Sequence, residues 1–331
     1  MKIFSLILAF LLMLTSPAYT ADLKDILSKY DSKPESNTMT FGGKKGSFSK
    51  GLSLTIPKIV TDNSQFIMKP IHYSGTNAIA PLVNNGTLDF GASNIVQAHW
   101  LYTSTGQFLG KDYSNLRHVA TLMVLRLCPV VPQHSSIKEL RNVIGTRTPY
   151  FYRAAPVYRH ITDAILGTEN IKPRELNLKS ASSLKFARRM FIKNQVDWVF
   201  TSLGSSWPQK AAIKFKDGIR CLNLTKTDKS LRAAKKYMSK YAYIDTVSAG
   251  SYVPVKEQTN VLAYYYTMWA STHTSDKKVY AVTKAIYENV DELMKMSKIW
   301  KTFDKNVMAN FDRKLIHPGA IKFYTDIGLI K

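Results

Sequence analysis

Residues 71–96 combine two apolar runs with a polar turn and an amphipathic segment. Apolar side chains recur at helical spacing over residues 78–83, and the small polar segment 74–77 comes just before them. A serine or threonine in such a segment can cap a helix, and the Asn-Asn-Gly sequence at 84–86 tolerates the positive φ that a helix end requires. A second apolar run starts at Leu88. The pattern therefore predicts a strand, a helix and another strand, which together form a βαβ unit.

The predicted turn at 74–77 carries hydroxyl and amide groups. A helix N-terminus leaves backbone N–H groups unpaired, so a turn with this lining suits an anion. The glycine- and lysine-containing loop at 42–48 also follows an apolar segment and suits close approach of the backbone to an anion. Its spacing matches neither a Walker loop nor a dinucleotide fingerprint. An ordinary capped helix and a plain glycine-rich turn are the alternative interpretations of these two segments.

The alternation of apolar and amphipathic segments continues along the chain and predicts an α/β fold. Residues 116–131 are almost continuously apolar and too long for a strand of usual length, so they predict two strands, the second of which carries the chain into another lobe. Residues 279–293 carry apolar side chains at helical spacing and predict one regular helix. Further helices are predicted at 154–166 and 186–192, and further strands at 142–145, 196–200, 218–224 and 261–270.

Residues 1–20 have the features of a secretory signal peptide. Lys2 is followed by an apolar run at 3–14 that is too short to span a bilayer, and small residues precede Ala18 and Thr20. Cleavage after one of these two residues predicts an exported, periplasmic protein. The mature chain of about 310 residues is longer than one hydrophobic core usually organises, so two lobes are expected.

The formal net charge of +23 arises from 46 lysines and arginines against 23 acidic residues. This excess favours an anionic partner, which could be a small ligand, lipid head groups or nucleic acid. Export argues against nucleic acid. The densest run of positive charge, at 226–240, is predicted to be a solvated helix face and not a ligand site. The hydrophobic content of 45% excludes a disordered chain.

The chain has two cysteines, Cys128 and Cys221, so it does not rest on a disulfide framework. One bridge and two separate buried thiols are both open. The motifs HExxH, GxSxG and CxxC do not occur, and the seven histidines show no metal-ligand spacing. No catalytic residues, metal site or cofactor are predicted. An exported hydrolase with scattered catalytic residues and a basic, adhesin-like surface protein remain as alternatives to a binding receptor.

Short segments with a recognisable order extend over most of the mature chain. They are Gly46-Ser47-Phe48, Ser74-Gly75-Thr76-Asn77, Leu88-Asp89-Phe90-Gly91 leading to Asn94, Leu116-Arg117-His118-Val119-Ala120, Val196-Asp197 leading to Gly204 and Pro208, Ala249-Gly250-Ser251-Tyr252, the helix at 279–285, and His317-Pro318-Gly319-Ala320. In this order they resemble the substrate-binding receptors of TRAP transporters, specifically the TAXI family. No single segment is specific, but the ordered set is.

The resemblance implies a two-lobed periplasmic-binding-protein-like fold of type II, with mixed sheets flanked by helices. Lobe I would consist of residues 38–125 and 225–331, and lobe II of residues 126–224. Such a receptor is not an enzyme. It captures a small organic anion, such as a glutamate-like amino acid or another carboxylate, in the cleft between the lobes. It then delivers this ligand to the membrane subunits of a TRAP transporter.

The resemblance also places the ligand-binding residues. They are Gly46, Ser47, Phe48, Ser74, Thr76, Asn77, Asn94, Tyr152, Arg153, Gly204 and Ser205. The family usually has Pro-Gly-Ser-Gly-Thr-Arg where this chain has three aromatic residues before Arg153. Arg153 is expected to be the main anion anchor, because an arginine at the start of a helix is unfavourable unless an anion binds there. A solvated Arg153, or one paired with Asp163, is the alternative.

Overall fold

The computed structural model describes residues 36–44, 47–153 and 155–331, with the backbone alone for residue 44 and for residues 47–50. Residues 39–331 form one compact unit, to which the central sheet and its flanking helices belong. The predicted signal peptide lies outside the described residues. Within the described ranges, none of the helices has the length and apolar character needed to cross a membrane.

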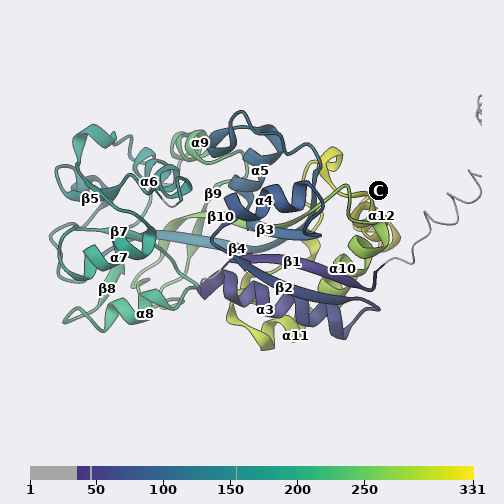
Figure 1. Ribbon diagram of the computed structural model, residues 1–331. Helices are drawn as coiled ribbons and strands as arrows, with labels where there is room; N and C mark the ends of the chain where they lie inside the picture. The colour runs from purple at the N-terminus through teal and green to yellow at the C-terminus, as the bar shows by residue number, and fades with distance from the viewer. Residues whose placement is uncertain (1–35, 45–46, 154) are drawn as a thin grey trace, which may run out of the picture. The chain divides into compact units, whose positions relative to one another are not determined.

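A mixed sheet of eight strands organises the described residues, with the order β2-β1-β3-β10-β4-β7 (Figure 1). In addition, β8 pairs with β4 and β9 pairs with β10. Strands β1 and β3 are parallel, whereas β10 runs antiparallel to β3, β4 and β9. A separate parallel pair consists of β5 and β6. The strands are β1 (Thr38–Lys44), β2 (Ile67–Tyr73), β3 (Phe90–Asn94), β4 (Leu116–Pro132), β5 (Arg147–Tyr150), β6 (Asn177–Ser180), β7 (Val199–Ser202), β8 (Ile219–Cys221), β9 (Tyr243–Val247) and β10 (Thr259–Ser271).

Helices cover both faces of this sheet, which makes the fold a layered α/β structure (Figure 1). The helices are α3 (Ser47–Asp62), α4 (Thr76–Asn84), α5 (Ile95–Thr103), α6 (Val157–Gly167), α7 (Leu184–Ile192), α8 (Trp207–Ala212), α9 (Asp228–Tyr237), α10 (Asp276–Glu288), α11 (Val290–Met296) and α12 (Pro318–Asp326). One buried cluster joins the sheet to α3, α10 and α12 through residues such as Phe41, Ile56 and Val282. A second cluster joins it to α4, α5 and α6 and includes Trp198 and Trp269.

The predicted βαβ unit is present as β2, α4 and β3. Gly86 has φ of 78°, as the predicted helix end requires. The cap at the start differs from the expectation, because Gly75 occupies the N-cap position and no side chain caps α4. The N-cap of α5 is a side chain, since Asn94 Oδ1 accepts a hydrogen bond from the Gln97 amide at 2.9 Å.

The apolar run at 116–131 is one strand, β4, and the prediction of two strands is wrong. Residues up to Leu127 pair with β10, and from Leu127 onward the strand pairs with β7 and β8. Both parts are flanked by other strands and largely buried, so their side chains are mostly apolar and the sequence shows no boundary. The sheet is therefore continuous through residues 116–132, and the break between two strands that we expected here is absent. The boundaries of the two lobes stay a prediction.

Two predicted helices differ from the structure: one is divided in two, and the other begins later than predicted. The helix predicted at 279–293 is divided into α10 and α11 at Asn289, whose φ of −118° and ψ of 39° are not helical. The helix predicted at 154–166 begins only at Val157, after Pro156. Proline disfavours the helical conformation in the residue before it, so a helix tends to start at or after the proline. Arg153 consequently lies ahead of α6, and the helix-dipole argument for its role does not apply.

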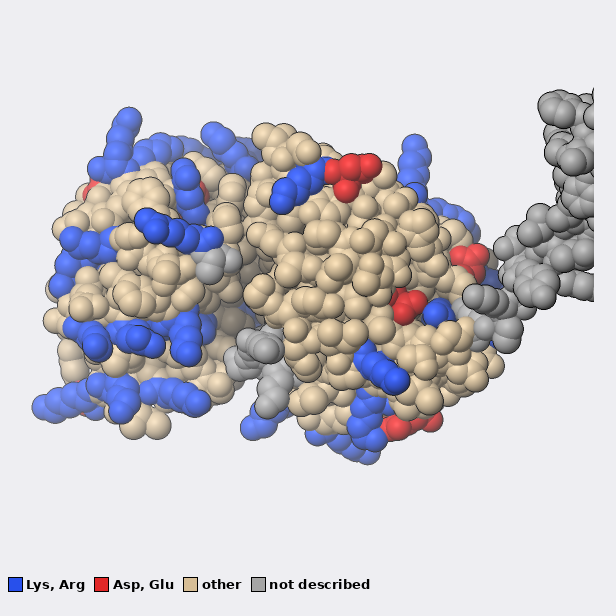
Figure 2. Space-filling model, in the orientation of Figure 1, with Lys and Arg blue, Asp and Glu red and all other residues tan. Residues whose placement is uncertain are grey.

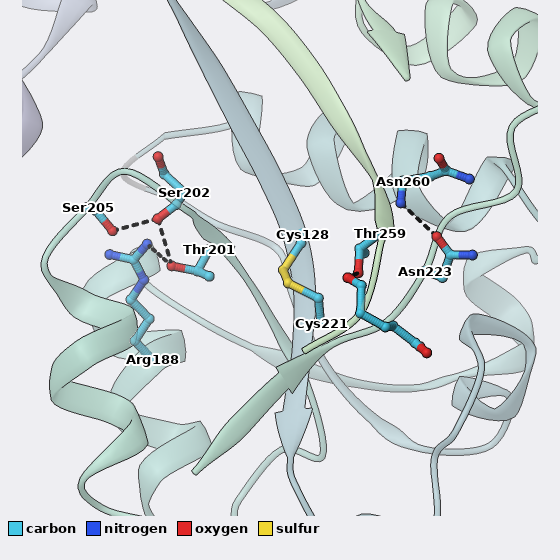
Figure 3. The surroundings of a disulfide bond; sticks show 10 residues. Cys128, Arg188, Thr201, Ser202, Ser205, Cys221, Asn223, Thr259 and Asn260 are labelled. Carbon is cyan, nitrogen blue, oxygen red and sulfur yellow. Dashed lines mark hydrogen bonds between the residues drawn. A yellow bond between two sulfur atoms is a disulfide. The ribbon is translucent and has the colours of Figure 1, made fainter. Parts of the chain in front are cut away.

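Cys128 and Cys221 form a disulfide bond, with their Cα atoms 5.8 Å apart, so the alternative of two free thiols is wrong. The bond joins β4 to β8 beside the pairing of Val130 with Cys221 (Figure 3). Leu222 N continues this contact by donating to the Pro129 carbonyl at 2.8 Å. The bond thus fixes the segment that leaves β8 against the second half of β4.

Candidate functional site

A cavity of about 450 Å³ opens beside the middle of β4. The walls come from four segments of the sequence: the middle of β4, the end of β7 and the residues after it, the residues in and after β9, and the residues after α11. The lining residues are Val124, Leu125, Arg126, Ser202, Leu203, Gly204, Gln209, Thr246, Val247, Ser248, Ser251, Tyr252, Lys298, Ile299, Lys301 and Thr302. Gly204 is one of the residues predicted from sequence. This cavity is large enough for a small organic ligand.

The charged groups around this cavity are predominantly cationic. Arg126 Nε is paired with Asp245 Oδ2 at 2.6 Å, which neutralises the one arginine in the lining. Lys298 and Lys301 add two positive charges without a salt bridge in the described part of the chain. Thr302 fixes their segment against β4, because its Oγ1 accepts from Val124 N at 3.2 Å and donates to the Val124 carbonyl at 3.1 Å. A negatively charged ligand would therefore be favoured in the cavity.

The surface outside the cavity also carries an excess of positive charge. Figure 2 shows lysines and arginines spread over the part of the molecule that carries β5, α7 and α8, with few acidic residues between them. The exposed ones include Lys185, Arg189, Lys210 and Lys214. This surface adds long-range attraction for anions to the local charge of the cavity.

Thr76 and Asn94, both predicted from sequence, meet at the ends of β2 and β3. Gln97 connects them, since its Oε1 accepts from Asn94 Nδ2 at 2.7 Å and from Thr76 Oγ1 at 3.3 Å. All three side chains are buried. Asn77 is exposed and points elsewhere, because its Oδ1 accepts from Gln107 Nε2 at 2.8 Å. Ser74 is exposed.

Of the site residues predicted in lobe II, some lie in the core and others on the surface. Tyr152 is buried and packs edge-to-face against Tyr158 and Phe200, with ring centroids 5.6 and 6.2 Å apart. Ser205 is buried and donates to the Ser202 carbonyl at 2.8 Å. Gly204 is exposed at the rim of the cavity.

Arg153 is exposed, and no ion pair to it is formed within the described residues. The alternative pairing with Asp163 is wrong. Asp163 is 3.7 Å from Arg159 Nε and accepts from the Tyr150 hydroxyl at 2.6 Å. Burial raises the pKa of Asp163, although Tyr150 and Arg159 act in the opposite direction. This carboxylate is thus occupied by neighbours other than Arg153.

The first predicted loop is only partly described. Gly46 lies outside the described residues. Ser47 and Phe48 form the start of the α3 backbone. Their roles stay predictions.

The sequence prediction missed Arg188 on α7, whose guanidinium points to the end of β7 (Figure 3). Its Nη2 donates to Thr201 Oγ1 at 3.1 Å, and its Cζ lies 4.8 Å from the Trp207 ring centroid. Burial lowers the pKa of Arg188 to about 10, and Tyr158 and Tyr152 act against this change. A signal was present in the sequence, because Arg188 lies four residues after Leu184 and four before Ile192, on the apolar face of the helix.

Within the described ranges, no three His, Cys, Asp or Glu side chains lie close enough together to hold a metal ion.

Among solved structures, the chain is similar to PhnD1 from Prochlorococcus marinus in complex with methylphosphonate, with a TM-score of 0.54 and 11% identity over 89% of this chain and 99% of that one. It is also similar to the periplasmic aliphatic sulphonate binding protein SsuA from Escherichia coli, with a TM-score of 0.49 and 13% identity over 89% and 94% of the two chains. The likeness to PhnD1 confirms the predicted mixed α/β fold with flanking helices. Residues 49–328 match the NMT1-like family, and the chain therefore belongs to that family.

Proposed function

We propose that this protein is an extracytoplasmic solute receptor. It captures a small organic anion, a glutamate-like amino acid or another carboxylate, between lobe I (38–125 and 225–331) and lobe II (126–224). The observation that carries the proposal is the cavity, because it has walls from both sets of residues and two lysines without salt bridges in the described part of the chain. Excess positive charge in a partly enclosed cavity favours anions without requiring a catalytic group.

Export and delivery are further parts of the proposal. The disulfide suits an oxidising compartment such as the periplasm, in agreement with the predicted signal peptide. The ordered segments that resemble TAXI receptors favour the membrane subunits of a TRAP transporter as the partner. In this scheme Ser74, Thr76, Asn77, Asn94, Tyr152, Arg153, Gly204 and Ser205 belong to the ligand-binding region, together with the loop at 46–48.

A solute panel with the mature protein tests this function. Amino acids, dicarboxylates, sulfonates and phosphonates would be screened by thermal shift, and the hits measured by calorimetry. We expect one-to-one binding of an anion with Kd near the micromolar range, which corresponds to about −8 kcal/mol. The ligand should be recovered unchanged after long incubation. Binding of no solute would contradict the receptor function, and release of a cleaved product would favour the exported hydrolase.

A phosphonate is the second candidate ligand. Its support is the fold likeness to PhnD1, whose structure contains methylphosphonate. The same panel separates the two ligands, because a receptor for phosphonates should bind methylphosphonate more tightly than any carboxylate tested.

The lysines of the cavity provide a matched test of its role. Changing Lys298 and Lys301 together to glutamine should weaken binding of the anion about tenfold, or about 1.4 kcal/mol, because two favourable charges are lost. Lys235 and Lys236 of α9 are exposed and do not line the cavity. The corresponding double glutamine variant should bind within about 0.5 kcal/mol of the parent. Calorimetry on both variants decides whether the cavity or the α9 face binds the ligand.

A further inference from the structure

The environment of Arg188 differs from that of the other inward-facing arginines of the described chain. Arg126 and Arg147 each form a salt bridge with an aspartate at 2.6 Å. Arg220 donates to several backbone carbonyl groups, including that of Ile137 at 2.5 Å. Arg188 has no carboxylate partner within the described residues, and Thr201 provides its one hydrogen-bond acceptor there. Its Nε is shielded from solvent and has no hydrogen-bond partner in the same part of the chain.

A guanidinium with a shielded and unpaired N–H group destabilises the fold unless other interactions offset the loss of hydration. A buried cation loses its hydration, and the loss is offset only by a counter-charge and by acceptors for its N–H groups. The Trp207 ring offsets part of it through a cation–π contact at 4.8 Å. The Nε–H group, which solvent does not reach, still lacks an acceptor within the described residues. An anion bound beside Arg188 would supply both the charge and the acceptors.

The groups around Arg188 are suited to such an anion. Tyr152 and Tyr158 lie close enough for each to influence the Arg188 charge, and neither is acidic at neutral pH because burial raises the pKa of both hydroxyls. Phenol groups that stay protonated can donate hydrogen bonds to an anion. Tyr264 of β10 lies near Tyr158 and is also buried, so a second part of the chain reaches this group.

Arg188 does not line the cavity itself, but it contacts the residue that comes directly before part of the lining. Thr201, its acceptor, is followed by Ser202, Leu203 and Gly204, which line the cavity. Figure 3 shows Arg188 beside this end of β7, with Ser202 and Ser205 close by. Tyr152 follows the end of β5, and Arg188 reaches the end of β7 from α7.

We propose that Arg188, with the hydroxyl groups of Tyr152 and Tyr158, binds a singly charged oxyanion of the ligand, which is a carboxylate or a sulfonate. The proposal rests on the proposed receptor function and names the group of the ligand that the site recognises. One guanidinium among neutral hydroxyls balances one negative charge. A phosphonate that has lost both of its protons would leave a charge unpaired in the same surroundings. The planar fork of the guanidinium matches two oxygens of a carboxylate or sulfonate.

The test uses the mature protein and the variants Arg188→Met, Arg188→Lys, Arg189→Met and Arg153→Met. Arg189 is the neighbouring residue on α7 and is exposed, so its replacement removes the same charge from the surface of the same helix. The probes are acetate, methanesulfonate, L-glutamate and methylphosphonate, with sodium chloride as the control for ionic strength. Thermal unfolding is measured with and without each probe.

We expect the carboxylate or sulfonate probes to raise the unfolding midpoint of the parent and of Arg189→Met. The shift should be absent in Arg188→Met and reduced in Arg188→Lys, which keeps the charge but loses the fork. Without any probe, the midpoint of Arg188→Met should equal or exceed that of the parent, because a half-buried charge whose shielded Nε has no acceptor in the described part of the chain has been removed. An arginine with a structural role predicts a lower midpoint instead.

The outcomes separate the two proposals. If none of the probes and no member of the solute panel stabilises the parent, the receptor function fails. If the parent is stabilised and Arg188→Met keeps the shift, the assignment of Arg188 fails while the receptor function stands. The assignment also fails if Arg188→Met lowers the midpoint without a probe, or if methylphosphonate alone stabilises the parent. Loss of the shift in Arg153→Met but not in Arg188→Met would return the role to Arg153.

Discussion

Replacing Cys128 and Cys221 together with alanine is expected to lower the free energy of unfolding by about 4 kcal/mol. The two residues are 93 positions apart in the sequence, so the bond closes a long loop and removes much conformational freedom from the unfolded chain. Cys128 is fully buried between β4 and its neighbours, and loss of its sulfur also removes packing. Urea unfolding followed by tryptophan fluorescence measures the effect as a lower midpoint.

The parent protein with a reducing agent is the matched control, because it keeps both sulfur atoms and lacks only the bond. Most of the loss should appear in the reduced parent, with a smaller additional loss in the alanine variant. Reduction under unfolding conditions followed by refolding is needed, since Cys128 is fully buried. An unchanged midpoint in the reduced parent would mean that the bond does not stabilise the fold, and the loss in the variant would then come from packing.

The pairing of these cysteines could not be predicted from the sequence. A separation of 93 residues carries no information about distance, and an apolar strand around Cys128 suits a buried thiol as well as a bridge. Only the return of β8 to β4 brings the two sulfur atoms together. In contrast, the unit β2-α4-β3 could be predicted because its apolar spacing, its turn residues and Gly86 all indicate the same local structure.

In the candidate site, too, some features could be predicted from the local sequence and others depend on tertiary structure. Thr76 follows β2 and Asn94 ends β3, and strand ends gather at one edge of a sheet, so their proximity was predictable. Arg188 was not identified, because a charged residue on an amphipathic helix usually belongs to the solvated face. Its direction depends on how α7 packs against β7 and Trp207, which is a property of tertiary structure. The helix-dipole argument for Arg153 was wrong, because Pro156 determines where α6 begins, and the role of Arg153 stays a prediction.

Acidification from about pH 6.5 to pH 5 is expected to destabilise the protein by about 2 kcal/mol through His118 alone. His118 is fully buried, stacks on Phe311 with centroids 4.2 Å apart, and its Nε2 is 3.3 Å from Thr121 Oγ1. Burial lowers the pKa of His118 from 6.5 to about 3, against a smaller opposite effect of the Met308 backbone. Between these two values the unfolded chain binds a proton that the folded chain does not. The stabilisation is therefore complete above pH 6.5 and declines as the pH falls, by about 1.4 kcal/mol per unit.

The variant His118→Phe tests this assignment. Phenylalanine keeps the stack on Phe311 and cannot bind a proton, while Thr121 Oγ1 keeps the Asn310 carbonyl as an acceptor at 3.3 Å. The free energy of unfolding is measured with urea at several pH values between 7.5 and 5. As the pH falls, it should decline less steeply in the variant than in the parent. The difference in slope should be about 1.4 kcal/mol per pH unit, which corresponds to about one proton taken up on unfolding. His99, His160 and His317 also have pKa values lowered by burial, so some decline should remain in the variant. Equal slopes in the variant and the parent would show that His118 becomes protonated in the folded protein, and that its surroundings open to water above pH 5.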